Sequence, residues 1–113
     1  TVSTASAKHG GGGKSMAYGV ARAGIECMTK GLAREGAPYN ILVNCVSPGF
    51  IDTSFQTTKA GKTKEDYEKR IKLIPLKRAG RPEEVATIIL YLISEWSGFI
   101  TGECITVSGG DWL

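Results

Sequence analysis

The stretch SMAYGVARAGIECMTKGLAREG, Ser15–Gly36, constrains the fold more than any other part of the sequence. Small and apolar side chains recur in it near the spacing of one helix face. Ser15 is a suitable N-cap, and Gly36 with Pro38 supplies a stop signal. The stretch therefore predicts one long helix, and its small residues permit close packing against a sheet or a partner helix.

Tyr18 and Arg22 lie four positions apart in this predicted helix, so their side chains project from one face. A permanent cation stabilises a nearby phenolate, and therefore helps a phenol to exchange its proton. The pair can be a proton donor and its activator, or an ordinary surface pair. The neighbouring stretches favour the first interpretation.

Two segments typical of strands flank the helix in the sequence. Thr1–Thr4 has the character of a strand end, and Asn40–Val46 is a short apolar run bounded by turn residues. Strands joined through a helix run parallel with a right-handed crossover, and such sheets bind ligands beyond the carboxyl ends of their strands. Residues 3–6 and 47–53 are therefore expected to meet beside the start of the helix.

The remaining segments complete an alternating pattern of helices and strands. Four consecutive glycines make Ala5–Lys14 a predicted flexible loop, and the polar, irregular segment Phe50–Lys64 is a candidate lid. Glu65–Leu73 predicts a charged helix. A second apolar helix is expected from Pro82 to about Ser97, and Glu103–Val107 predicts a final buried strand.

Composition excludes several functional classes. A chain of 113 residues forms at most one small domain, and its net charge of +3 is spread without a basic run, which argues against nucleic-acid binding. The longest apolar run, Thr87–Ile93, is too short to span a membrane. Cys27, Cys45 and Cys104 stand alone without metal-ligand spacing, so no metal is expected. The three thiols are expected to be buried, in a cytoplasmic protein.

In this order, the motifs resemble the C-terminal half of a short-chain dehydrogenase/reductase. They are a strand end with Ser and Thr, a glycine loop, AYxxA[KR]AG, a strand, SPGxIxT, GRPEE and ITGExITVxGG. The resemblance implies an α/β fold, namely the C-terminal part of a doubly wound, parallel-sheet Rossmann fold, with residues 1–113 forming one partial domain. It also implies NAD or NADP as cofactor. The glycine-rich turn that holds the other half of a dinucleotide is not present in the sequence.

The resemblance assigns roles to individual residues. Tyr18 matches the family's catalytic acid/base. Pro48, Gly49 and Ile51 match the loop that covers the nicotinamide, with the Ile51 backbone near its carboxamide, and Thr53 matches a position that reaches the cofactor phosphates.

Two positions of the candidate site depart from the family pattern. Arg22 stands where the family has a lysine that contacts the nicotinamide ribose and activates the tyrosine. Arginine keeps the positive charge, but its planar fork is not an equivalent replacement, so reduced activity is expected. The family's substrate-binding serine falls best on Thr4, with Ser6 and Ser3 as alternatives.

Two functions remain open from the sequence. The first is an oxidoreductase that transfers a hydride between NAD(P) and a small carbonyl or alcohol substrate, with Tyr18 as acid/base. The second is a non-catalytic family remnant, or a structural or oligomerising subunit. The chain alone is expected to be inactive, and a homo-oligomer is expected in the full-length form, paired through the Tyr18 helix.

Overall fold

A computed structural model describes the chain except for residues 12, 55, 57–62 and 112. Two parallel strands lie at its centre, β1 (Cys45–Pro48) and β2 (Cys104–Val107), with Cys45 opposite Cys104. On the other edge of β1, Val2 forms a parallel bridge with Val46. Three segments therefore run in one direction, as the sequence pattern predicts.

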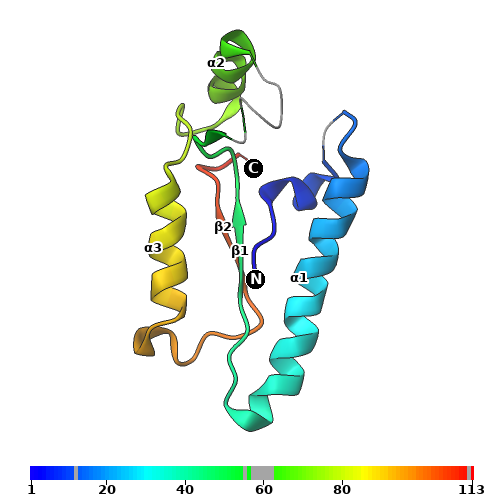
Figure 1. The fold of residues 1–113 in the computed structure, drawn as a ribbon, viewed down its shortest axis with the longest axis vertical. Coiled ribbons are helices and arrows are strands. Elements are labelled where there is room, and N and C mark those ends of the chain that lie inside the picture. The colour runs from blue at the N-terminus through cyan, green and yellow to red at the C-terminus, as the bar shows by residue number, and fades with distance from the viewer. Residues whose placement is uncertain (12, 55, 57–62, 112) are drawn as a thin grey trace.

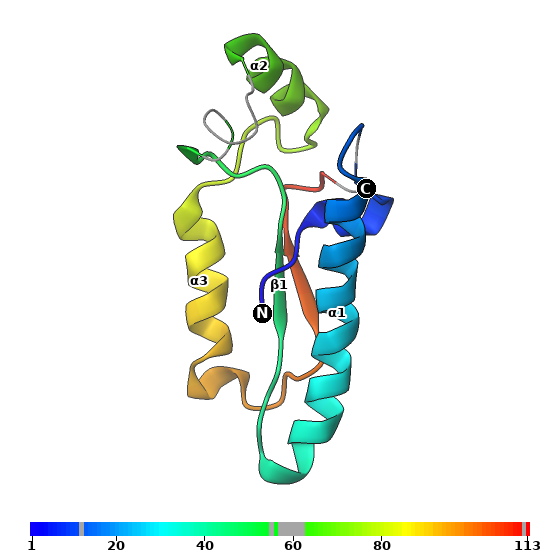
Figure 2. The same ribbon diagram turned by 45° about the vertical axis from the view of Figure 1, so that its right-hand side comes forward.

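Long helices flank these strands on opposite sides. α1 (Met16–Gly36) lies on one side and α3 (Pro82–Leu92) on the other, and both contact β1 (Figures 1 and 2). The α/β class and the parallel strands are confirmed.

Shorter helices connect and cap these elements. The 3-10 turns are η1 (Ala5–His9), η2 (Ala37–Tyr39) and η4 (Glu95–Ser97). A further helix, α2 (Lys64–Leu73), begins with reciprocal hydrogen bonds between Thr63 and Asp66, and lies beyond the carboxyl ends of the strands (Figure 1).

Several sequence predictions need correction. The strand expected at Asn40–Val46 begins only at Cys45 and ends at Pro48, and side chains supply part of the hydrogen bonding of the residues before it. The Asn44 amide, for example, donates to the Ile100 carbonyl (2.7 Å) and accepts from the Glu103 N–H (3.1 Å). The predicted flexible loop starts as the ordered turn η1, and the helix from Pro82 ends at Leu92.

The candidate lid can be described only in part, because residues 55 and 57–62 lie outside the described structure. Within the described part of the chain, no helix combines the length and the apolar character needed to cross a membrane.

α1 packs on the strands through small residues and leaves larger ones outside. Its buried residues are Gly19, Thr29 and Ala33, whereas Val20 and Met28 are exposed. Cys27 is also exposed, so the expectation that all three cysteines are buried was wrong.

Candidate active site

The predicted site residues come from segments that follow the first strand segment and β1, together with the first turns of α1. Thr4 and Ser6 lie at the start of η1, which packs against α1. Pro48 ends β1, and its carbonyl oxygen accepts a long hydrogen bond from Thr4 Oγ1 (3.5 Å). The segments expected to meet at the carboxyl edge of the sheet therefore do so.

Tyr18 occupies the first turn of α1 and is 42% exposed. Its hydroxyl makes no hydrogen bond to any other described residue. A phenol with an unengaged hydroxyl can donate a proton to a ligand or accept one from it.

Arg22 lies directly against Tyr18, with its guanidinium carbon 5.2 Å from the centroid of the phenol ring. This distance is typical of a cation–π contact. Arg22 Nη1 also donates to the Val2 carbonyl oxygen at 3.0 Å. The guanidinium is therefore held between the ring and the strand segment that precedes η1.

The three candidate hydroxyls have different partners. Ser3 is 4% exposed and its hydroxyl bonds to Glu26 Oε1 (2.8 Å) and to the Arg22 carbonyl (3.0 Å). Thr4 accepts from the Ser6 N–H (3.4 Å) as the cap of η1. The Ser6 hydroxyl makes no hydrogen bond within the described part of the chain, which leaves it available to a ligand.

Gly19, which the sequence analysis did not single out, brings the glycine loop against the helix. A Cβ atom at this position would lie 2.9 Å from Gly10 C and 3.1 Å from Gly11 N. Only a glycine allows this approach beside Tyr18. The sequence signal that could have identified Gly19 is a glycine inside a predicted helix, next to a candidate catalytic tyrosine.

The loop after β1 is held tightly on two sides. The Gly49 N–H donates to the Val107 carbonyl (2.9 Å), and a Cβ at Gly49 would lie 2.6 Å from that of Ser108. Further along, Ile51 forms a parallel bridge with Gly80. That bridge uses the Asp52 and Gly80 N–H groups (2.8 and 2.9 Å), and leaves the Ile51 N–H without a partner among the described residues.

These groups fit the nicotinamide end of NAD or NADP. The Ile51 N–H can donate to a carboxamide oxygen, and Thr53 is exposed with a hydroxyl that makes no hydrogen bond in the described chain. Arg22 fits less well, because the Val2 carbonyl already engages it.

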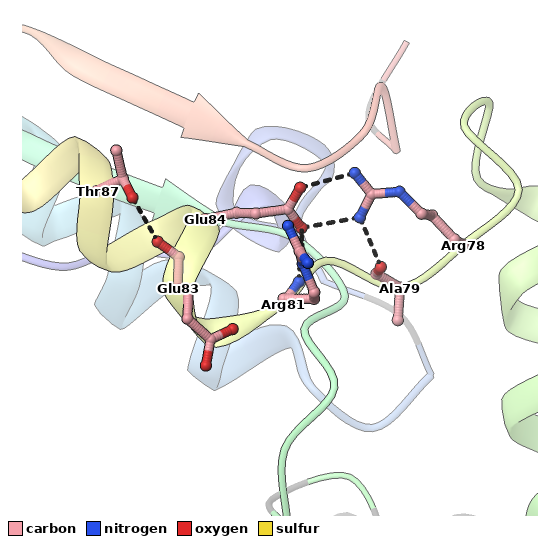
Figure 3. A network of polar contacts seen from close by, with 6 residues as sticks. All are labelled: Arg78, Ala79, Arg81, Glu83, Glu84 and Thr87. Atoms are coloured by element: carbon pink, nitrogen blue, oxygen red, sulfur yellow. Dashed lines mark hydrogen bonds and ion pairs between the residues drawn. The ribbon is translucent and has the colours of Figure 1, made fainter.

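Glu84 stabilises the segment that pairs with Ile51 (Figure 3). Its carboxylate accepts two hydrogen bonds from the Arg78 guanidinium (2.7 and 2.8 Å) and one from the Arg81 N–H (2.7 Å). The Arg78 hydrogen bonds, followed by that from the Arg81 backbone, lower the pKa of Glu84 to about 2. Gly80 is thus fixed between two anchored arginines.

Helix α2 is anchored to the same loop by aromatic and charged side chains. The rings of Phe50 and Tyr67 lie 5.0 Å apart, and Arg70 lies over Phe50 while pairing with Asp111. Burial, followed by the hydrogen bond and charge of Asp52, raises the pKa of Tyr67. Tyr67 therefore stays a neutral donor near neutral pH.

Two cavities lie among the described residues, and neither includes Tyr18 in its lining. One of about 320 Å³ lies between α3 and β2, and it is lined by Gly80 and Ser108, which contact the loop after β1, as well as by Ile88 and Val107. The other, of about 210 Å³, lies beside Val46 and Ile89. Neither is lined by Tyr18 or by the Ser6 hydroxyl, so cavity volume does not select the site.

Comparison with known proteins identifies the relatives of the chain. A family model described as enoyl-(acyl carrier protein) reductase matches residues 1–111. The 3-oxoacyl-[acyl-carrier-protein] reductase FabG of Aquifex aeolicus is 47% identical over 93 residues, 82% of this chain and 36% of that protein. An NAD-dependent glycerol dehydrogenase of Listeria innocua is 46% identical over 98 residues, 86% of this chain and 37% of the relative.

Solved structures share the fold. A short-chain dehydrogenase/reductase from Brucella melitensis superposes with a TM-score of 0.87 at 36% identity, covering 100% of this chain and 44% of its own. YwfH, an NADPH-dependent reductase of bacilysin biosynthesis, gives a TM-score of 0.86 at 31% identity, with 97% and 44% covered. The chain therefore spans less than half the length of these relatives.

Proposed function

The chain belongs to the short-chain dehydrogenase/reductase family, and we propose that it supplies the catalytic, nicotinamide-side part of an NAD(P)-dependent oxidoreductase. In this proposal residues 1–113 form one partial domain of a doubly wound Rossmann fold. The substrate is a small carbonyl compound or the corresponding alcohol. The observation that carries the proposal is the Tyr18 hydroxyl, which makes no hydrogen bond to any other described residue and is held beside Arg22 at the start of the helix that packs against η1, the turn that contains Ser6.

Proton transfer is the part of the reaction that falls to this chain's own residues. When bound, a reduced nicotinamide supplies a hydride to the carbonyl carbon. Tyr18 donates its proton to the carbonyl oxygen as the alcohol forms, and the phenolate regains a proton from solvent. Ser6 donates a hydrogen bond to that oxygen and orients it, while Arg22 stabilises the transient phenolate.

The loop after β1 would hold the nicotinamide end of the cofactor. The Ile51 N–H would bond the carboxamide, Pro48 and Gly49 would shape the covering loop, and Thr53 would reach a phosphate. The glycerol dehydrogenase and YwfH, named above, use NAD and NADPH respectively, so either form of the cofactor suits the proposal.

A non-catalytic role is the alternative, and one contact favours it. Arg22 Nη1 is bonded to the Val2 carbonyl, whereas the lysine of the family pattern contacts the cofactor ribose. An arginine held in this way would bind NAD(P) weakly. Substituting Arg22→Lys should then tighten NADPH binding, measured by nicotinamide fluorescence, if this contact alone limits the affinity.

Tyr18→Phe tests the proposed function. The assay follows NADH or NADPH absorbance with acetoacetyl-CoA, a 3-oxoacyl thioester and therefore of the substrate class named for the FabG relative. It uses the chain alone, and a chimeric reductase in which this chain follows the part of the Aquifex aeolicus FabG that precedes its match. We expect turnover in the chimeric reductase, and a fall in kcat of about 100-fold or more on removal of the acid/base hydroxyl.

Tyr91→Phe is the matched control, because Tyr91 is also 42% exposed but lies on α3, where it donates to the Trp96 carbonyl (3.4 Å). Its kcat should stay unchanged. Turnover that survives Tyr18→Phe, or no turnover in either form, would refute the oxidoreductase proposal and favour the non-catalytic role.

The outer face of α1 is also proposed to pair with a second copy of the chain. Val20, Gly24, Cys27 and Gly31 are exposed and lie on the side opposite buried Thr29. Neither glycine has an atom within 4 Å of an added Cβ, so the face is open to a closely packed helix.

A further inference from the structure

Three polar contacts join the first residues of the chain to one face of α1. Thr1 Oγ1 bonds Thr29 Oγ1 (2.8 Å), and the Ser3 hydroxyl bonds Glu26 Oε1 (2.8 Å). Arg22 Nη1 donates to the Val2 carbonyl (3.0 Å). Residues 22, 26 and 29 recur at helical spacing, so the contacts form a continuous line, here called the polar seam.

The polar seam continues directly into the candidate active site. Tyr18 lies one turn before Arg22 on the same face, and the Arg22 guanidinium lies over its ring. On the strand side, Ser3 is followed at once by Thr4, whose hydroxyl caps the turn that carries Ser6. The polar seam thus borders both groups that are proposed to act on one substrate oxygen, Tyr18 along α1 and Ser6 along the chain.

The two residues that contribute hydroxyls at the centre of the polar seam are buried. Ser3 is 4% exposed and Thr29 is 1% exposed. Apolar packing is not directional, so small residues alone would permit α1 to slide or rotate on the strands. Hydrogen bonds require a narrow geometry, and a slip of one residue turns a helix by about 100° and breaks them.

We propose that Ser3 and Glu26 are positioning residues that fix the register of α1 against the first strand segment, and so orient Tyr18 toward Ser6. The Ser3 hydroxyl also bonds the Arg22 carbonyl (3.0 Å), and therefore holds the turn from which the Arg22 side chain extends. This role gains its catalytic meaning from the proposed function of Tyr18, whereas its test does not require turnover.

The test is the fluorine NMR spectrum of the complete chain labelled with 3-fluorotyrosine. The chain has four tyrosines, and Tyr18→Phe identifies the Tyr18 resonance. Ser3→Ala and Glu26→Ala should each move that resonance by more than its linewidth, or split it, and leave the other three in place. Glu26→Gln keeps an acceptor oxygen for Ser3 and should retain the original position.

Ser97→Ala is the matched control. Ser97 is 1% exposed and its hydroxyl proton is shared between the Leu92 and Ser94 carbonyls (2.9 and 3.1 Å), beyond the end of α3. It should lower the unfolding midpoint to a degree similar to Ser3→Ala without moving the Tyr18 resonance.

An unmoved Tyr18 resonance in a folded Ser3→Ala chain would overturn the positioning role. If circular dichroism shows that Ser3→Ala does not fold, the two Glu26 variants decide instead. A shift in Glu26→Ala that is absent from Glu26→Gln supports the role, and equal behaviour of the two contradicts it. If Tyr18→Phe loses turnover but the Ser3 and Glu26 variants do not shift the Tyr18 resonance, the proposed function stands and only the positioning role of Ser3 and Glu26 is rejected.

Discussion

At the scale of single residues, the absence of a side chain at Gly19 is as important to the site as the reactive side chains are. Gly19→Ala would place a methyl group about 3 Å from the backbone of Gly10 and Gly11, where no flexible side chain can yield. We expect a loss of about 1–3 kcal/mol in the free energy of unfolding, as for an overpacked core, measured by urea denaturation. Gly31→Ala is the control, because its methyl group meets no atom within 4 Å and favours the helix. Equal effects of the two substitutions would contradict the close approach.

Substitutions that remove single hydroxyls also decide whether Thr4 or Ser6 orients the substrate oxygen. Ser6→Ala removes a group that makes no hydrogen bond in the described chain, so stability should change by less than about 0.5 kcal/mol. In the chimeric reductase, kcat should fall about 100-fold, because one donor to the reacting oxygen is lost. Thr4→Val removes the cap of η1 instead and should cost about 1 kcal/mol of stability. A normal kcat in Ser6→Ala would return the role to Thr4.

At the scale of elements, the N-terminus of α3 should be sensitive to acid. The ordinary carboxyl pKa of 4.5 falls to about 2 for Glu84 in the folded chain, mainly through its hydrogen bonds with Arg78. A lowered folded-state pKa means that the ionised form stabilises the fold. That contribution is complete above about pH 4.5 and disappears as the pH falls through 2.

Thermal unfolding between pH 7 and pH 2 measures this effect in wild type and Glu84→Gln. The wild-type midpoint should exceed that of the variant near neutral pH, and the difference should shrink between pH 4.5 and 2. Glu65→Gln is the control, since Glu65 pairs with Lys69 on an exposed face of α2 (76% and 69% exposed side chains) and should contribute little. A constant difference between wild type and Glu84→Gln would exclude the titration of Glu84 as its cause.

Sequence patterns predicted the elements better than their contacts. The limits of α1 and the nearness of Tyr18 and Arg22 follow from local periodicity, which a sequence displays directly. The bond from Arg22 to the Val2 carbonyl depends on the path of a distant backbone segment, and no spacing reveals it. The preference for Ser6 over Thr4 likewise depends on η1, a turn that a glycine-rich composition concealed.

At the scale of the whole molecule, a short chain leaves much apolar surface uncovered. It spans 36% of the Aquifex relative and 44% of the Brucella structure, and large side chains such as Val20, Met28 and Leu90 stay exposed. Exposed apolar patches of this kind mark sites where other protein surfaces bind. Two such surfaces lie on opposite sides of the strands, on α1 and on α3.

The α1 surface is the easier of the two to test, because a substitution at one of its glycines should change the stability of the monomer and its dimerisation in opposite directions. Gly24→Leu adds a helix-favouring side chain in open space, so the unfolding free energy of the monomer should rise by up to about 1 kcal/mol. The same side chain would block a second α1 from close approach, so sedimentation should show a smaller dimer fraction. Lys30→Leu adds similar bulk at an exposed position about a quarter turn away from this face and should leave the dimer intact. A dimer that survives Gly24→Leu would move the interface elsewhere, and the exposed side chains of α3 are then the surface to substitute.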